Sequence, residues 1–291
     1  AVLPCMKIPP TAVSRMLLAL SLAATQALGQ TDGTPDTAFD FDGSRRIPFD
    51  LSGSTLFDVP AAVAVQADGS LVVAGTVDDG TLLRDAAVAR LTPAGELDPS
   101  FGAGGKYVAE FSYDEESSAV ALLADGSIVV AGSWQSVPPG SPSVWLRVLS
   151  ASGTPVTGAG IPPNGLLLDP RVGLAYDRFA GKIYVAFSRQ VAGTPEIVIL
   201  RLNPVLSTDG GYGTAGRLAI QHFLGVPLYI RALALDDEGR LVVGATEGGP
   251  GGLDFCVMRA TSEGALDPTF GNGGHGFQTV PIELVASGDD D

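Results

Sequence analysis

Short apolar runs of Val, Ile, Leu and Ala recur along most of the chain, and Gly, Pro or acidic residues separate them. The runs are about four to eight residues long, which is typical of strands and short for helices. In several runs the apolar residues are consecutive rather than alternating, which indicates strands that are covered on both faces. No long pattern with helical spacing follows residue 30. The pattern predicts an all-β protein.

One phrase, in which an acidic or small residue and a glycine precede a β-rich run, occurs four times. Its copies are ADGSLVVAG (67–75), ADGSIVVAG (124–132), FAGKIYVAF (179–187) and DEGRLVVGA (237–245). Asp-Gly between two apolar runs is a strong hairpin signal, because a type I′ turn needs positive φ at both central residues. The four turn glycines lie 57, 55 and 58 residues apart, so the hairpin repeats on one period.

A second phrase, Asp-x-x-aromatic-x-x-x-Gly, follows the same period. Its copies are DTAFDFDG (36–43), DPSFGAGG (98–105), DGGYGTAG (209–216) and DPTFGNGG (267–274). The gap between the second and third copies is nearly two periods, so we expect a degenerate copy at TPVTGAGIPPNG (154–165). Two independent phrases on one period indicate a tandem repeat of about 57 residues.

Each repeat unit is expected to supply four strands, the first of which follows the closing glycine of the second phrase. After Gly105 these are KYVAEFS, AVALLA, SIVVAGSW and VWLRVLS. Tandem four-stranded units with glycine-rich links predict a β-propeller of about four blades, whose closure protects the sheet edges. The strand after Gly43 and HGFQTV after Gly274 occupy the same position in the repeat unit, namely the first expected strand. Either one is spare in a four-bladed ring, or HGFQTV begins a blade of a longer array.

The sequence LDPSFGAGGKYV, followed by AVALLADGSIVVAG, resembles the delta-60 repeat, an uncharacterised β-propeller-type repeat of exported bacterial proteins. The resemblance covers about residues 31–285. It implies a propeller fold and export, and it carries no established activity or site residues. The chain departs from the pattern at 154–165 and at Ala180-Gly181, where the acidic turn residue is missing.

The first residues read as a targeting segment. Lys7 and Arg15 precede the apolar run MLLALSLAATQALG (16–29), which ends in small residues. A bilayer span needs about 20 apolar residues, so this run is short for a membrane anchor and typical of a signal peptide. We expect a signal peptide at 1–29, in which residues 1–5 are extra upstream sequence.

The rest of the chain is then expected to be one repeat domain at 30–286 and an acidic tail at 287–291. Export from a bacterial cell predicts a secreted or periplasmic location. Cleavage would remove Cys5 and leave Cys256, which lies in the apolar run DFCVMR and is expected to be a buried thiol.

The formal net charge of −15 argues against nucleic acid and anionic membrane surfaces as partners. Acid-rich loops such as FDFDG (39–43) and the acids at 236–238 are candidates for calcium, but neither has EF-hand spacing, and turn formation explains them better. We therefore expect no cofactor, with calcium as the open alternative. The expected partner is a protein or a polysaccharide, and the expected state is a monomer that does not insert into a membrane.

An arginine closes the fourth expected strand of each unit, and three of the four arginines have an aspartate eight residues later. The pairs are Arg90 and Asp98, Arg201 and Asp209, and Arg259 and Asp267. We expect structural ion pairs that fix the loop to the next strand. The alternative is a set of guanidinium groups that bind an anion in a central channel.

Arg147 is the exception, because Pro155 stands where the aspartate would be. The same unit contains Trp134 and Trp145 and the irregular insert QSVPPGSPS (135–143). We expect a ligand site formed by Trp134, Arg147 and Trp145, for a sugar or an aromatic ligand. Trp145 occupies the slot of small apolar residues in the other units, so a core role is its alternative.

Signatures of catalysis are sparse. The chain has two histidines and no GxSxG, HExxH or P-loop motif. We therefore expect a non-catalytic binding or scaffold module. A carboxylate-based hydrolase or lyase with its site in the central funnel is the first alternative. A truncated segment of a larger surface protein is the second.

Overall fold

The computed structural model describes residues 34–49, 51, 57–78, 80, 83–109, 113–135, 142–222, 225–249 and 252–280. The expected signal peptide, the acidic tail and most of the 135–143 insert lie outside these residues. The chain divides into two compact units, residues 1–46 and 47–291, and each is described by itself. Within the described ranges, no helix is long and apolar enough to cross a bilayer.

In the first unit, the phrase DTAFDFDG forms a compact turn. The amide of Phe39 donates to the Asp36 carbonyl at 2.9 Å, and the amide of Gly43 donates to the Phe39 carbonyl at 2.7 Å. Gly43 has a φ of +82°, and a Cβ there would lie 2.6 Å from Pro35. The loop that begins at Asp98 makes the same two bonds, from Phe101 and Gly105. The repeated phrase is therefore a repeated backbone conformation.

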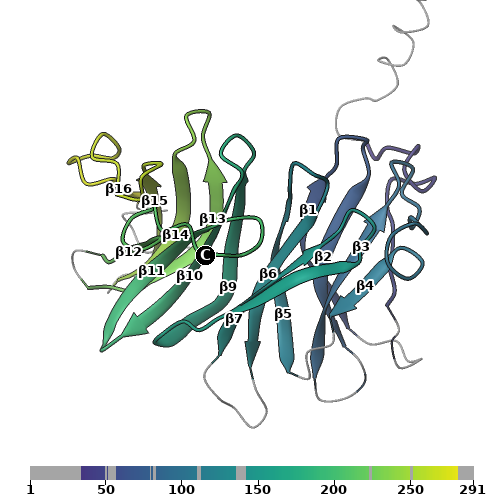
Figure 1. The fold of residues 1–291 in the computed structure, drawn as a ribbon, viewed down its shortest axis with the longest axis horizontal. Coiled ribbons are helices and arrows are strands. Elements are labelled where there is room, and N and C mark those ends of the chain that lie inside the picture. The colour runs from purple at the N-terminus through teal and green to yellow at the C-terminus, as the bar shows by residue number, and fades with distance from the viewer. Residues whose placement is uncertain are drawn as a thin grey trace, which may run out of the picture. The chain divides into compact units, whose positions relative to one another are not determined.

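The second unit contains four antiparallel sheets of four strands each, which we call blades one to four (Figure 1). In each blade the strands pair in chain order, as in a meander. The strands are β1 (Asp58–Val65), β2 (Leu71–Asp78), β3 (Arg84–Leu91) and β4 (Lys106–Ala109) in blade one; β5 (Asp114–Leu122), β6 (Ile128–Gln135), β7 (Ser143–Leu149) and β8 (Pro155–Ile161) in blade two; β9 (Leu166–Asp177), β10 (Lys182–Val191), β11 (Thr194–Leu202) and β12 (Arg217–Ile220) in blade three; and β13 (Leu228–Leu235), β14 (Leu241–Gly249), β15 (Gly252–Ala260) and β16 (Phe277–Val280) in blade four.

Our grouping of strands into units was wrong by one strand. β4 follows Gly105, yet it pairs with β3 and is the last strand of blade one, not the first of blade two. The loop before it explains this, because the Asp98 amide donates to the Arg90 carbonyl and the Arg90 amide donates to the Gly105 carbonyl, both at 2.9 Å. These bonds return the chain alongside β3. By the same rule β16, which contains FQTV, completes blade four and is neither spare nor the start of another blade.

The degenerate copy expected at 154–165 is not a loop of this kind. Residues Pro155–Ile161 form β8, which pairs with β7 along most of its length. This segment lacks both the aspartate and the aromatic residue, so it cannot make the turn that those side chains fix. Blade two therefore passes directly from β7 into its fourth strand.

Consecutive blades pack face to face, and a cluster of buried apolar side chains fills each junction. One cluster joins blades one and two, the second joins blades two and three, and the third joins blades three and four. Neighbouring residues of one strand, such as Ile128 and Val129, are both fully buried but belong to different clusters. This confirms that central strands are covered on both faces. The protein is an all-β, four-bladed β-propeller, as the repeat predicted.

Candidate functional site

The three Arg and Asp pairs expected from the eight-residue spacing are ion pairs in the structure. Arg Nε lies 2.8 Å, 2.9 Å and 2.7 Å from Asp Oδ2 in blades one, three and four. Each guanidinium also lies 4.8–4.9 Å from the centre of the aromatic ring of its own loop, a cation–π arrangement. These loops, residues 98–105, 209–216 and 267–274, are called latch loops below.

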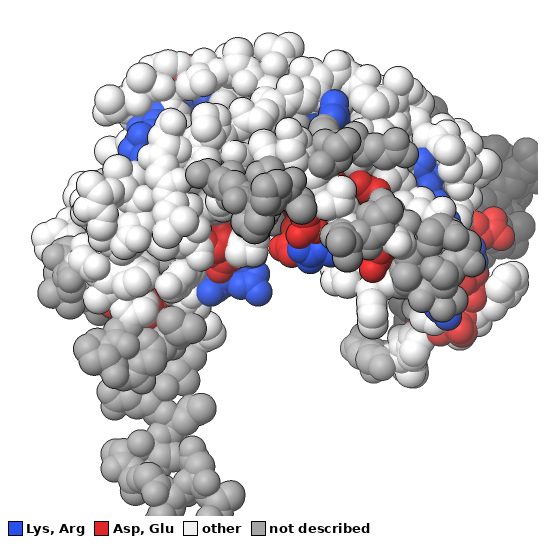
Figure 2. Space-filling view, turned by 90° about the horizontal axis from the view of Figure 1, so that it is seen from below, with Lys and Arg blue, Asp and Glu red and all other residues white. Residues whose placement is uncertain are grey.

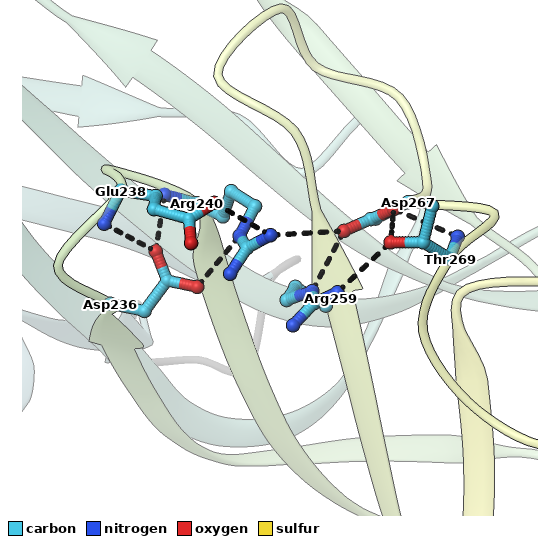
Figure 3. Close-up of polar contacts among 6 residues, drawn as sticks. All are labelled: Asp236, Glu238, Arg240, Arg259, Asp267 and Thr269. Carbon is cyan, nitrogen blue, oxygen red and sulfur yellow. Dashed lines mark hydrogen bonds and ion pairs between the residues drawn. The ribbon is translucent and has the colours of Figure 1, made fainter.

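Figure 3 shows how a second cation extends the pair in blade four. Arg240 Nη1 lies 3.9 Å from Asp267, and Arg240 Nε lies 2.8 Å from Asp236. Hydrogen bonds from Thr269, and then the Arg259 guanidinium, lower the pKa of Asp267 to about 2. In blade three, Lys182 occupies the same position and lies 3.0 Å from Asp209.

The acids of the loop at 236–238 thus bind groups of the same turn. Asp236 accepts hydrogen bonds from the amides of Glu238 and Arg240, and Glu238 lies 2.8 Å from Arg240. In the described part of the chain, no cluster of His, Cys, Asp or Glu has the arrangement of a metal site. Cys256 is buried against blade three, and burial raises the pKa of its thiol to about 12, so it stays a neutral apolar group.

The latch loops of blades one and three also bind the next blade. Gly102 in the loop of blade one donates its amide to the Ser152 carbonyl at 2.8 Å, and Arg90 Nη1 donates to the Ala151 carbonyl. In blade three, Gly213 donates to the Glu263 carbonyl at 2.7 Å, and Arg201 donates to a carbonyl of the same turn at 2.6 Å. The Arg and Asp pairs therefore have a structural role: they shape a loop that locks one blade to the following one.

The residues expected to bind a ligand come together in blade two. A cavity of about 280 Å³ is lined by Tyr113, both tryptophans, Arg147 and the β8 residues 158–160. Tyr113 and Trp134 are stacked, with ring centres 4.1 Å apart and planes inclined by 30°. Sequence reasoning missed Tyr113, which precedes β5 in a segment without periodic pattern.

The three expected residues contribute differently. Trp145 is only 3% exposed, belongs to the cluster between blades one and two, and donates its indole N–H to the Ser133 carbonyl at 3.0 Å. It forms the floor of the cavity. Arg147 lies against β8, where a Cβ on Gly158 would come within 3.1 Å of its guanidinium, so glycine makes room for it. Trp134 stands at the end of β6 and is half-buried.

A second cavity, of about 240 Å³, lies on the other side of Trp134, between blades one, two and three. Its lining is charged. Arg84 donates from Nε and Nη2 to the two oxygens of Asp114, both at 2.8 Å, and lies 2.6 Å from Glu116. These bonds lower the pKa of Asp114. Asp169, from blade three, lies 2.6 Å from Arg231. Figure 2 shows acidic and basic side chains gathered side by side in the hollowed part of the face seen from below.

In the sequence, the partly buried Asp114 and Glu116 flank a fully buried acid, Glu115. Glu115 is fully buried, and its Oε1 accepts a hydrogen bond from the Tyr113 amide at 3.1 Å. Burial, and then the negative charge of the buried Asp85, raise the pKa of Glu115 to about 8. The run DEE at 114–116, at the start of a strand that continues as SSAVAL, was the signal in the sequence for this acidic cluster. Among 32 acids it did not stand out.

The repeated blades, their latch loops and their interblade cores define a repeat-built β-propeller. Consistent with this, the family described as "Domain of unknown function (DUF5122) beta-propeller" matches residues 66–101 and 239–270. The first match spans the β2–β3 hairpin and the first half of the latch loop of blade one, and the second spans the equivalent parts of blade four. No curated protein matches the sequence.

Several solved structures resemble the chain. A mannose phosphorylase from Leishmania mexicana has 12% identity and a TM-score of 0.44, covering 92% of this chain and 78% of its own. A PQQ-bound aldose sugar dehydrogenase from Streptomyces coelicolor has 19% identity and a TM-score of 0.43, covering 77% and 67%. An endo-arabinase from Bacteroides thetaiotaomicron has 15% identity and a TM-score of 0.45, covering 82% and 83%. At these values the activities of those enzymes carry no conclusion for this chain.

Proposed function

We propose that the protein is an exported, non-catalytic binding module that holds a saccharide chain at the Tyr113–Trp134 pair of blade two. The stacked aromatic pair between two cavities carries this proposal. Aromatic faces pack against apolar surfaces while a polar rim fixes orientation, and pyranose rings combine apolar C–H faces with hydroxyl groups. The first cavity supplies the apolar wall, and the Arg84, Asp114 and Glu116 cluster supplies charged partners for hydroxyl groups.

The same proposal includes the remaining expectations from the sequence. The repeat is of the delta-60 type, the protein acts outside the cytoplasm in a secreted or periplasmic location, and its partners exclude nucleic acid. A polysaccharide fits the strongly acidic chain if it is neutral or carries basic groups, because a polyanion would be repelled. Binding requires neither a metal nor an organic cofactor.

A glycan array followed by calorimetric titration of the best oligosaccharide tests the proposal. We expect Trp134→Ala to weaken binding at least tenfold, and Trp134→Phe to weaken it less, because a flat ring remains. Phe179→Ala is the matched control, since Phe179 is an exposed aromatic side chain in blade three, outside both cavities. Equal affinity for Trp134→Ala and the control, or no oligosaccharide bound by the wild type, would contradict the proposal.

One observation favours a second function, a carboxylate-based hydrolase or lyase. Glu115, whose pKa is raised, follows Asp114, whose pKa is lowered, in β5, and its carboxyl group interacts with that of the buried Asp85. One protonated and one ionised carboxyl group are what general acid–base cleavage of a glycosidic bond needs. Release of reducing or unsaturated ends from polysaccharides, abolished by Glu115→Gln and retained in Glu96→Gln, would establish this function. No release by the wild type would exclude it.

A further inference from the structure

The structure contains the same interblade junction more than once, and the repetition shows what each half of the junction requires. The outgoing half consists of a latch loop with a buried aromatic residue, Phe101 in blade one and Tyr212 in blade three. The incoming half consists of the tight turn after the third strand of the next blade. Gly153 and Gly264 hold φ values of +80° and +86° in these turns, where a Cβ would lie less than 3.0 Å from the latch loop.

The outgoing half in blade four has no such counterpart. Phe270 occupies the position of Phe101 and Tyr212, which are fully buried, but is itself only half-buried. Within the described ranges, no carbonyl of another blade accepts a hydrogen bond from Arg259 or from the amide of Gly271. The latch of blade four is therefore fully formed, and among the described residues it bonds to no other blade.

In blades one to three, one sheet face packs against the following blade, and we call it the outgoing face. In blade four the corresponding face is uncovered in the described part of the chain. Phe255 pairs with Thr246, just as Val144 pairs with Ser133 in blade two. Val144 is fully buried against blade three, whereas Phe255 is 55% exposed. A large apolar side chain is thus open to water at a position that is buried between blades elsewhere in the molecule.

Blade one shows the complementary incoming face. Val63 and Val65 of β1 stand at the positions of Val120 and Leu122 of β5, which pack into the cluster between blades one and two. In blade one these valines are 63% and 66% exposed. The three interblade clusters have no fourth member between blades four and one in the described part of the chain.

We propose that a second copy of this chain covers these surfaces, with the outgoing face of blade four docked on the incoming face of blade one of the partner subunit. By analogy with the two internal latches, Arg259 Nη1 donates to the carbonyl of Pro93 of the partner subunit, and the Gly271 amide donates to the carbonyl of Ala94 of the partner subunit. Phe255 meets the exposed valines of β1. This departs from the monomer expected from the sequence.

Two features fix the character of the assembly. The two faces differ, so the contact is heterologous and repeats until a closed ring of copies forms, with two copies as the smallest ring. Thr76 and Ser188 each accept an amide hydrogen bond from the following blade, from Ser117 and Ile230. Pro60 holds that position in blade one and has no N–H, so the junction between copies rests on the latch and the apolar contact.

Light scattering after size exclusion, over a hundredfold range of concentration, tests the assembly with the full chain. We expect a mass of two copies or more, and Phe255→Asp and Val63→Asp should each shift the protein toward one copy. Phe179→Asp, at an exposed aromatic residue on neither face, should leave the mass unchanged. A single-copy mass at all concentrations would overturn the proposal, and so would an assembly that both face variants leave intact.

A disulfide experiment distinguishes contact between copies from closure within one chain. Chains carrying Ala94→Cys are mixed with chains carrying Asn272→Cys under mild oxidation, while Cys5 and the buried Cys256 are replaced by Ser in both. We expect a disulfide-linked pair of chains that forms only in the mixture. If instead a chain carrying both new cysteines links internally and no linked pair forms in the mixture, blade four closes on blade one of its own chain and the proposal is wrong.

Discussion

At the scale of single residues, one arginine position serves two purposes in this chain. In blades one, three and four it pairs with the aspartate eight residues later, and the spacing alone was enough to predict that pair. In blade two, Pro155 replaces the aspartate, and Arg147 lines a cavity with Trp134. The bidentate pair of Arg84 and Asp114 could not be predicted, because its members lie thirty residues apart on different blades and no periodic pattern connects them.

The buried carboxyl group of Glu115 makes stability depend on pH. Its pKa is about 8 in the folded protein and near the ordinary 4.5 when unfolded, so the folded state retains a proton that the unfolded chain releases. This contribution is complete below pH 4.5 and is lost as the pH rises toward 8. We expect Glu115→Gln to remove the loss and to exceed the wild type at pH 8 by about 1–3 kcal/mol in free energy of unfolding.

Urea denaturation at pH 5 and at pH 8 measures this effect. Glu96→Gln is the control, because Glu96 is an exposed acid on a turn of blade one. It should follow the pH dependence of the wild type. The same change in stability between pH 5 and pH 8 for Glu115→Gln and the wild type would show that Glu115 does not carry the buried proton.

At the scale of elements, the latch loop decides how strands are shared between blades. The apolar runs were recognisable as strands, but periodicity does not say which neighbour a strand pairs with. The backbone bonds between Arg90, Asp98 and Gly105 place β4 beside β3, and these bonds depend on side-chain chemistry in a loop rather than on any pattern of apolar residues. For this reason the number of strands in each blade was predicted, whereas the strands that share a blade were not.

The glycine in the turn that contacts the latch loop is expected to tolerate no side chain. At Gly153 a Cβ would lie 2.7 Å from the amide nitrogen of Gly102, and φ is +80°. We expect Gly153→Ala to lower the free energy of unfolding by about 2–4 kcal/mol, since it combines left-handed strain with a clash against backbone. Thermal or urea unfolding checks this. Gly160→Ala in β8, where a Cβ meets nothing within 4 Å, should be neutral or slightly stabilising; equal losses in the two variants would refute the latch.

At the scale of the whole molecule, the repeat predicted the fold class and the number of blades, because two phrases on one period leave few architectures open. The repeat could not show which blade faces are uncovered. All four units present similar apolar strands, and only the packed structure separates Val120, which packs against the core between blades one and two, from exposed Val63. The candidate site shows the same limit. Both tryptophans stood out in the sequence, but the sequence could not show that Trp145 is buried under the cavity while Trp134 stacks on Tyr113, because this depends on how the blades pack.

Blade two differs from the other blades because β8 replaces the latch loop. Where blade two lacks its loop, the next blade no longer needs glycine in its turn, and Leu206 adopts a φ of +64° there and packs into the core between blades two and three. The surface vacated by the loop is the surface on which residues 158–160 border the aromatic cavity. The repeat that lacks the latch loop is thus the one that borders the aromatic cavity, while the latch loops of blades one and three fasten their neighbouring blades.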